Sequence, residues 1–421
     1  MLDKQLPASG KAHRSQPRSA VVLLDANQRA AVSCIRSLSN LYPSVQVFAA
    51  MAATGVLHRT FLPYSSHSRS VRVLRYDGTE PARFLSSLVA FVDIAGPYVL
   101  FPSGEHLLRW ALASKEQLEA AGVTLPMVDL ATYEIMSNKL TFAETVASYG
   151  IPVPKRYERP PEPWRHPFVI KPKTQRHHAP RVLDAPLLVD SPRAYAALRS
   201  FALDMDAHFC QEFVQGPSHY YCALYWRRAK QLSFTQMTLA QQPNGKSVVC
   251  AVPAEITPAV VARIDAMMLD LDWSGLMMIE LKASADQLLA IECNPRVWGP
   301  LQVAIDNGVD FPAGLWRLAV EGEEVTPEPH ADDVDTTYGY RWIGGYAQGA
   351  LAVIAGEGTF QTVRDGVTQV KQVTFRDIWW RRDTVLYGLI EPALMLASTV
   401  RSIIAKALHR WATASRRRTP D

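Results

Sequence analysis

The chain of 421 residues lacks the cysteine patterns that mark disulfide frameworks and zinc sites. Its five cysteines form no CxxC pair and show no histidine spacing typical of zinc, so we expect reduced, buried cysteines in a cytosolic protein. The first nineteen residues are polar and basic, without the apolar core of a signal peptide. We therefore interpret residues 1–19 as a disordered basic arm.

Dinucleotide fingerprints and long apolar runs are missing too. No GxGxxG follows the first apolar segment, residues 20–25, so the sequence does not support a dinucleotide site. The apolar run at 385–400 is interrupted by Glu391 and Pro392, and it falls short of the ~20 residues that spanning a bilayer requires. No activated serine or cysteine nucleophile is visible either, which disfavours covalent catalysis through the protein.

The net charge of +4 is unevenly distributed. From Arg376 to the end, nine Lys or Arg face four acids, so the remainder of the chain is slightly acidic. We expect residues 376–421 to form an amphipathic basic helical tail. Such a face suits an anionic membrane surface, or it packs on the protein's own core or a dimer mate, and both alternatives stay open. Nucleic acid is not an expected partner, because the basic cluster lacks a recognition module.

The length predicts two or three domains. Apolar segments at 20–25, 45–49 and 98–101 alternate with helical patterns, including 105–121, which indicates a parallel α/β unit near the N-terminus. Ligands of such sheets bind beyond the carboxyl ends of the strands, so 25–27 and 103–105 are candidates for lining a substrate site. Capping of the following helices explains these residues equally well.

Two apolar runs, residues 276–283 and 288–294, predict a β-hairpin. Strand alternation places Glu280 and Lys282 on one face, and Glu292 and Asn294 likewise share a face. A loop of three or five residues would set Glu280 opposite Glu292, whereas a loop of four would pair it with Ile291. We expect the odd loop, because it gathers the carboxylates and buries the apolar side chains together.

Carboxylate and amide oxygens hold Mg²⁺ or Mn²⁺ when nucleotide phosphates supply other ligand positions. Glu280, Glu292 and Asn294 are therefore the candidate metal ligands. Arg296 follows two residues after Asn294, and its planar fork suits a phosphate or acylphosphate oxygen. With Lys282 it forms the candidate catalytic pair. The alternative is a salt-bridged hairpin that faces solvent.

The run IECNPRVWGPLQVAIDNGVDFP, which begins at Ile291, resembles the closing motif of the ATP-grasp superfamily, in its carboxylate–amine ligase (carboligase) branch. The resemblance implies an ATP-grasp fold of the α/β and α+β classes, with an N-terminal parallel α/β pre-grasp domain and a C-terminal helical basic extension. The implied domains are a pre-grasp domain at 20–125, an ATP-grasp domain at 126–325 and a linker with core-associated strands at 326–375. Within the ATP-grasp domain, the clamp lobe is expected at about 155–235 and the metal-binding lobe at about 236–325.

The same resemblance implies the nucleotide-binding residues. Lys139 opens a helix for which Ser137 is the predicted N-cap, and Lys171 ends the apolar strand 168–172. A lysine in an apolar run is costly to bury unless an anion pairs with it, and ATP would be that anion. Lys173 is a weaker phosphate contact. Adenine would be bound by Glu212, Phe213 and Val214.

The chain departs from the family at three places. The phosphate-covering loop, residues 174–181, contains no glycine, and no acidic residue for the ribose follows the adenine-binding segment. Arginines that the branch often carries are replaced by Gln236, Thr238 and Gln241, which indicates an altered acceptor site.

The resemblance implies an enzyme that uses ATP and Mg²⁺ to activate a small carboxylate as an acylphosphate and to join it to an amine. Two alternatives stay open: a nucleotide-binding scaffold without turnover, and a ligase whose acceptor is a thiol or a membrane-associated molecule. A cytoplasmic homodimer is the default expectation, with peripheral contact at the inner face of the membrane as an alternative. The sequence does not identify the substrates.

Overall fold

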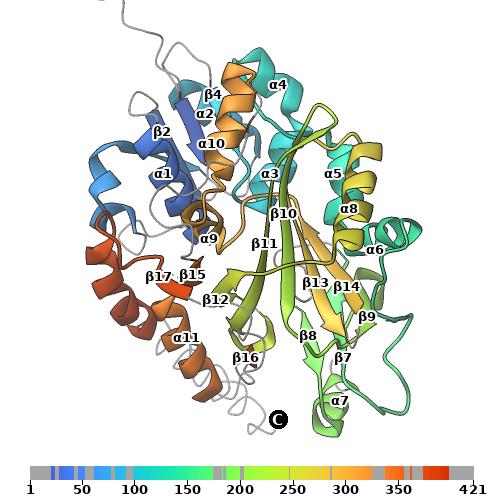
Figure 1. Ribbon diagram of the computed structural model, residues 1–421. Helices are drawn as coiled ribbons and strands as arrows, with labels where there is room; N and C mark the ends of the chain where they lie inside the picture. Colours follow the sequence, from blue (N-terminus) through green and yellow to red (C-terminus); the bar gives the residue numbers. More distant parts are fainter. Residues whose placement is uncertain are drawn as a thin grey trace, which may run out of the picture.

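The computed structural model describes most of the chain between Ala20 and Ala397, in segments that are separated by short gaps. Three sheets organise these residues (Figure 1). The basic arm 1–19, the loop 174–182, the linker 326–336 and the tail 398–421 lie outside the described residues. The segments described are 20–23, 28–41, 46–52, 61–76, 81–91, 98–173, 183, 186–199, 203–245, 247–284, 287–323, 325, 337–354, 361–362 and 373–397.

The first sheet is parallel, as the alternation of apolar strands and helical patterns predicted. Its strand order is β3-β2-β1-β4-β5, so the order reverses between β1 and β4. The sequence analysis did not anticipate β3 or α2. The elements are β1 (Ala20–Leu23), α1 (Arg29–Leu41), β2 (Gln46–Ala52), η2 (Leu62–Tyr64), η3 (Ser66–Arg69), β3 (Val71–Tyr76), α2 (Pro81–Phe91), β4 (Tyr98–Phe101) and β5 (Val123–Thr124).

Two helix predictions near this sheet need correction. The segment expected as one helix over 105–121 is divided at Ser114 into α3 (Glu105–Ala113) and α4 (Lys115–Ala120). Asn138, not Ser137, caps the helix that carries Lys139, because its side chain accepts a hydrogen bond from Leu140 N at 2.9 Å. Ser137 instead ends α5 (Leu130–Ser137), and α6 (Lys139–Ser148) follows directly.

The small sheet has the order β6-β9-β7-β8 and carries α7 (Pro192–Arg199). Phe168, Ile170 and Cys210 are fully buried in its own apolar core. We expected the clamp lobe to extend to about 235, but β10 and β11 pair within the large sheet instead. The elements are β6 (Arg156–Tyr157), β7 (Phe168–Pro172), β8 (Leu187–Val189), η4 (Met205–Ala207) and β9 (His208–Glu212).

The large sheet runs β14-β13-β10-β11-β12-β15-β17, with β16 paired to β11. It stands beside the small sheet in Figure 1, where β13 and β14 come close to β7 and β9. Its strands are β10 (Ser218–Trp226), β11 (Ala229–Gln241), β12 (Val248–Pro253), β13 (Gly275–Ser284), β14 (Gln287–Asn294), β15 (Thr337–Arg341), β16 (Gln361–Thr362) and β17 (Val373–Asp377).

Helices cover both faces of the large sheet. Alternate residues of β10 divide between two apolar cores: Tyr220 and Cys222 pack with α1 and α9, and Tyr221 and Ala223 pack with α6 and α8. Both cores also contain residues of the parallel sheet, so each core joins the parallel sheet to the large sheet. The remaining helices are η5 (Pro243–Gly245), α8 (Pro258–Asp270), α9 (Leu301–Asp306), α10 (Phe311–Trp316), the π-helix η6 (Arg317–Glu321) and α11 (Ile343–Ile354).

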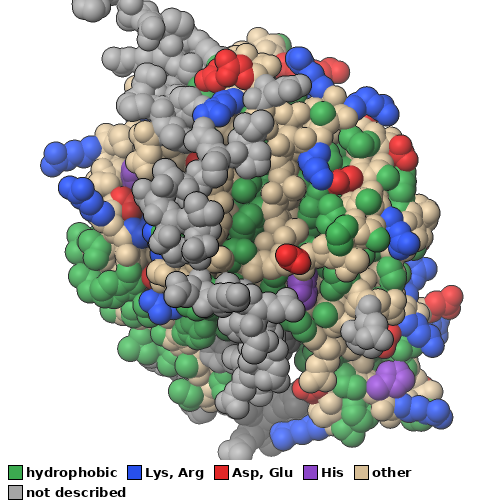
Figure 2. Space-filling view, in the orientation of Figure 1, with side chains coloured by type: hydrophobic (Ala, Val, Ile, Leu, Met, Phe, Trp, Pro, Cys, Tyr) green, Lys and Arg blue, Asp and Glu red, His purple; other side chains and the backbone are tan. Residues whose placement is uncertain are grey.

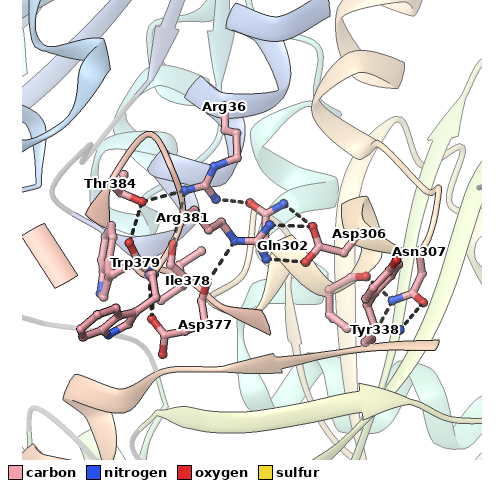
Figure 3. Close-up of polar contacts among 12 residues, drawn as sticks. Arg36, Gln302, Asp306, Asn307, Tyr338, Asp377, Ile378, Trp379, Arg381 and Thr384 are labelled. Atoms are coloured by element: carbon pink, nitrogen blue, oxygen red, sulfur yellow. Dashed lines mark hydrogen bonds and ion pairs between the residues drawn. The ribbon is translucent and has the colours of Figure 1, made fainter. Parts of the chain in front are cut away.

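The segment after β17 packs on the protein itself. Arg36 of α1 donates to Asp383, Thr384 and the Ile378 carbonyl, and Arg381 pairs with Asp306 of α9 (Figure 3). Residues 385–397 continue as a helix. For this part of the tail, packing on the core is therefore the arrangement found. Residues 398–421, which carry most of the predicted basic face, lie outside the described residues.

The outer side of helix 385–397 is apolar. Leu386 and Leu389 are 51% and 58% exposed, and Figure 2 shows hydrophobic side chains gathered where Figure 1 places the C-terminal helices. Within the described residues, none of the helices has the length and apolar character that crossing a bilayer needs. All five cysteines are free and buried, as expected from their spacing.

Candidate functional site

The β13–β14 hairpin sets Glu280 directly opposite Glu292, as the sequence predicted, but for a different reason. Ser284 pairs with Gln287, so the loop has two residues rather than three or five. The register then shifts between Glu280 and Leu281, which leaves Ile291 as the extra residue of a β-bulge. The bulge restores the pairing that an even loop alone would have lost.

The pKa values of the two carboxyl groups are shifted in opposite directions. Burial, followed by the charge of Glu292, raises the pKa of Glu280, although Ser218 donates a hydrogen bond to it at 2.7 Å. Burial also acts to raise the pKa of Glu292, but the charges of Lys139 and Lys171 outweigh that effect and lower it. Glu292 is thus the carboxylate that stays ionised, whereas a bound divalent cation would stabilise the ionised form of Glu280.

Two lysines from different elements converge on Glu292. Lys139, the first residue of α6, lies with Nζ 3.1 Å from Glu292 Oε2. Lys171, at the end of β7, is 7% exposed, and burial and then the charge of Lys139 lower its pKa to about 8. Among the residues that the structure describes, Lys171 makes no ion pair and no side-chain hydrogen bond. A buried cation without a partner is energetically costly, and a bound anion would remove that cost.

The other predicted hairpin residues form a short polar chain. Asn294 donates to Glu292 Oε1 at 3.1 Å, and Arg296 donates to Asn294 Oδ1 at 3.2 Å. Lys282 donates to the Gly216 carbonyl at 3.1 Å, while burial lowers its pKa against the opposing effect of Glu280. A methyl group on Gly216 would stand 2.1 Å from the Ala283 carbonyl oxygen, so only glycine permits this close approach.

A cleft lies between the small and large sheets, with about 730 Å³ of empty space when the open solvent at its mouth is included. All three predicted adenine-binding residues line it, and the Val214 N–H has no backbone partner among the described residues. The Glu212 carboxylate accepts a hydrogen bond from Lys155 N at 3.4 Å. The lining comprises Val169, Lys171, Pro186, Leu188, Gln211, Glu212, Phe213, Val214, Gln241, Gly245, Glu280, Lys282, Ile291 and Glu292.

Several lining residues escaped the sequence analysis, because only their strand pairing brings them to the cleft. Val169 and Gln211 face each other across β7 and β9. Lys173, in contrast, is not part of the lining, and its backbone N–H donates to the Ala207 carbonyl. The glycine-free loop that follows Lys173 lies outside the described residues.

The three residues that replace the expected arginines lie on β11. Gln236 pairs with Tyr220, Tyr220 with Glu280, and Glu280 with Glu292, so one row of the sheet joins β11 to the carboxylates. Gln236 is fully buried, and within the described part of the chain neither its amide oxygen nor its amide nitrogen has a hydrogen-bond partner. Thr238 and Gln241 follow on the same strand and are buried too.

The residues present fit a metal–nucleotide complex. Two carboxylates, Glu280 and Glu292, stand among four cationic side chains, an excess of two positive charges that an anionic nucleotide would balance. Among the described residues, no three His, Cys, Asp or Glu side chains converge as a complete metal site. Two carboxylates and the Asn294 amide are sufficient only when phosphate oxygens complete the coordination, as is usual for Mg²⁺. The cationic side chains are Lys139, Lys171, Lys282 and Arg296.

Comparison with known proteins identifies the fold. No protein-family model and no curated protein sequence matches the chain. Among solved structures, L-amino acid ligase from Bacillus licheniformis is 14% identical with a TM-score of 0.54, covering 75% of this chain and 78% of that one. The biotin carboxylase domain of Hydrogenobacter thermophilus 2-oxoglutarate carboxylase, solved with MgADP, ADP and bicarbonate, is 15% identical with a TM-score of 0.52 (74% and 71% covered). Phosphoribosylglycinamide synthetase from Anaerococcus prevotii is 10% identical with a TM-score of 0.51 (72% and 75% covered). The chain shares the fold of these structures, which is the ATP-grasp fold.

Proposed function

We propose that this protein is an ATP- and Mg²⁺-dependent ligase that activates a carboxylate as an acylphosphate and joins it to an amine. The observation that carries the proposal is the pairing of Glu280 with Glu292 beside Lys139 and Lys171. Both carboxylates and Lys171 line one cleft between the two sheets, which supports the binding of metal and phosphates together. A surface hairpin would not need an unpaired buried lysine beside two half-buried carboxylates.

The nucleotide fits the cleft with its base toward the small sheet. Phe213 and Val214 follow β9, where backbone N–H and C=O groups reach the edge of an adenine, and Val169 and Leu188 supply apolar contact to its faces. The phosphates then extend toward Lys171 and Lys139. The solved Hydrogenobacter domain holds MgADP and a Campylobacter jejuni biotin carboxylase structure is a complex with β-γ-ATP, which supports the same class of ligand here.

The reaction needs two displacements. An oxygen of the substrate carboxylate attacks the γ-phosphorus of ATP, the bond to the bridging oxygen breaks, and ADP leaves. The amine nitrogen then attacks the acyl carbon, the carbon–oxygen bond to phosphate breaks, and the ammonium loses a proton to give the amide. Mg²⁺, when bound by Glu280, Glu292 and Asn294, offsets the phosphate charge.

The protein's own side chains position and stabilise these groups. Lys139 and Lys171 hold phosphate oxygens in this proposal. Arg296, which donates to Asn294 Oδ1 and to the Val297 carbonyl, binds the acylphosphate through its remaining N–H groups. Lys282 is tethered to the Gly216 carbonyl, so it holds β13 against the end of the adenine-binding segment. Catalysis of this kind depends on positioning and electrostatics, so the absence of a protein nucleophile is no obstacle.

Hydroxylamine trapping tests the proposal directly. It attacks an acylphosphate and gives a coloured hydroxamate, so it replaces an unknown amine substrate. Purified protein with MgATP, hydroxylamine and pools of carboxylic acids should release ADP and hydroxamate together, and Glu292→Gln should abolish both. Glu255→Gln is the matched control, because Glu255 is exposed. Hydroxamate formation that Glu292→Gln leaves unchanged, or MgATP binding without hydroxamate from any pool, would reject the ligase.

A further inference from the structure

A second polar site lies at the point where the strand order of the parallel sheet reverses. The reversal falls between β1 and β4, whose carboxyl ends share one edge of the sheet. The connection from β14 to α9 lies against this edge, because Val297 N donates to the Pro102 carbonyl at 2.8 Å. Ligands of open α/β sheets bind in this kind of crevice. Arg29, the first residue of α1, stands at the same edge.

Arg29 is a cation that makes no ion pair among the described residues, although its charge tends to lower the pKa of the nearby Glu391. Its guanidinium stacks on the Trp342 ring, with Cζ 3.4 Å from the ring centroid. Its Nη1 is buried and has no hydrogen-bond partner, and Arg29 makes no ion pair with any residue that the structure describes. Stacking fixes the plane of the fork without using its N–H donors. The donors therefore remain available to a ligand.

Arg36 provides an internal comparison. It lies seven residues after Arg29 on the same face of α1. All three of its nitrogens donate hydrogen bonds, and it holds the C-terminal segment. Figure 3 shows its contacts with Gln302 and Thr384. A structural arginine of this helix thus has an acceptor at each nitrogen, whereas Arg29 does not. Its acceptors are Asp383, Gln302, Thr384 and the Ile378 carbonyl.

A second donor lies near Arg29. Gly299 packs closely against the guanidinium, because a methyl group at this position would stand 3.3 Å from Arg29 Nη2. Tyr340 is 1% exposed, and its hydroxyl has no hydrogen-bond partner among the described residues. The charge of Arg29 tends to lower the pKa of this hydroxyl, although burial raises it overall. The charges of Asp377 and Glu391 act in the opposite direction and raise the pKa of Tyr340, so the two carboxyl groups lie near the same site.

We propose that Arg29 binds a carboxylate group of one substrate at this crevice, with the Tyr340 hydroxyl as a second donor. The inference names a substrate class for the proposed ligase and so rests on that function. The substrate carries a carboxylate for recognition in addition to the group that reacts, as an amino acid or a dicarboxylic acid does. Arg29 is then a specificity residue, and Arg296 acts on the reacting end.

Thermal unfolding with bound MgADP tests the site without requiring turnover. The probes are the L-amino acids, short dicarboxylic acids, their primary amides and inorganic phosphate. At least one carboxylate should raise the melting temperature, and its amide should not. Arg29→Gln should weaken that binding by about 10- to 100-fold, the scale of a lost charge-assisted hydrogen-bonded pair. Arg193→Gln, at an exposed position of α7, is the matched control and should bind like the wild type.

Arg29→Lys decides the outcome if Arg29→Gln does not fold. Lysine keeps the charge but loses the planar fork, so binding should fall between the wild type and the Gln variant. Stabilisation by no carboxylate, by phosphate alone, or equally in wild type and both variants would overturn the subsite. Failure of the proposed ligase function would give a different result from failure of the subsite. In that case a carboxylate would bind through Arg29, but no hydroxamate would form with MgATP.

Discussion

Glu280 lies opposite Glu292 because the β13–β14 hairpin contains a bulge at Ile291. The pair is partly buried, and the two carboxylates repel each other. The charges of Lys139 and Lys171 lower the pKa of Glu292, whereas those of Lys282 and Lys171 do not overcome the effects that raise the pKa of Glu280. The ligand-free protein therefore stores an electrostatic cost that a bound cation removes. The repulsion should lower the free energy of unfolding and should raise the affinity for a metal–nucleotide complex, and both quantities can be measured.

Glu280→Gln should make the ligand-free protein more stable and the nucleotide complex weaker. The amide removes the repulsion with Glu292 and still accepts the hydrogen bond from Ser218. We expect a gain of ~1 kcal/mol in the free energy of unfolding by urea at neutral pH. MgATP should bind at least tenfold more weakly, the effect of losing ~1.4 kcal/mol. Equal stability and equal affinity in variant and wild type would contradict the stored cost.

The affinity for MgATP should fall as the pH rises through about 8, because Lys171 loses its proton there. The charged form binds phosphate, so affinity is fully present below that pH and declines above it, by at most about tenfold per pH unit. Lys171→Arg keeps its charge throughout and should show no such decline. Calorimetric titrations from pH 7 to pH 9 compare the two. Parallel pH profiles would assign the decline to another group.

Arg36→Ala should destabilise the protein strongly, since Gln302 Oε1 loses its donor and Asp383 loses the guanidinium, keeping contacts with His67 and Thr384. Arg36 is 8% exposed, and breaking a buried ion pair from one side costs ~3–5 kcal/mol. Arg382→Ala, at an exposed position of the same C-terminal segment, should change stability by less than ~0.5 kcal/mol. Equal melting temperatures for these two variants would show that the network of Figure 3 does not hold the segment.

Glu391 should make stability depend on pH. It is 3% exposed and accepts hydrogen bonds from the indoles of Trp342 and Trp379, yet burial raises its pKa from 4.5 to about 7. Its folded form holds a proton that the unfolded chain has lost, so its contribution is present below pH 4.5 and disappears as the pH rises through about 7. The change amounts to about 3 kcal/mol.

Glu391→Gln cannot titrate, so its free energy of unfolding should change less between pH 4.5 and pH 7 than that of the wild type. Urea unfolding at several pH values measures the difference. The same pH dependence in both proteins would mean that Glu391 is not the group responsible.

The sequence was informative where one short segment carries both pattern and chemistry. The hairpin predicted its own faces, and the run from Glu292 to Arg296 predicted the fold that the solved structures identify. Lys171 was recognisable because a lysine inside an apolar strand is costly without an anion. These signals are local, so they survive without knowledge of the rest of the chain.

What could not be predicted depends on contacts between distant segments. The bulge at Ile291 is invisible in a hairpin pattern, because loop length and bulge have compensating effects on register. Val169 and Gln211 reach the cleft only through the pairing of β7 with β9. The difference between Arg29 and Arg36 lies in acceptors that come from residues hundreds of positions away. Sequence periodicity places both arginines on one helix face and says no more.

Calorimetric titration of MgATP into the wild type and Glu292→Ala, each repeated with EDTA, tests the central claim most directly. The account predicts binding to the wild type that depends on Mg²⁺ and that is lost or sharply weakened in the variant. Glu255→Ala, at an exposed position, should behave as the wild type does. Wild-type binding that Glu292→Ala and EDTA leave unchanged, or no binding of MgATP to the wild type, would contradict it.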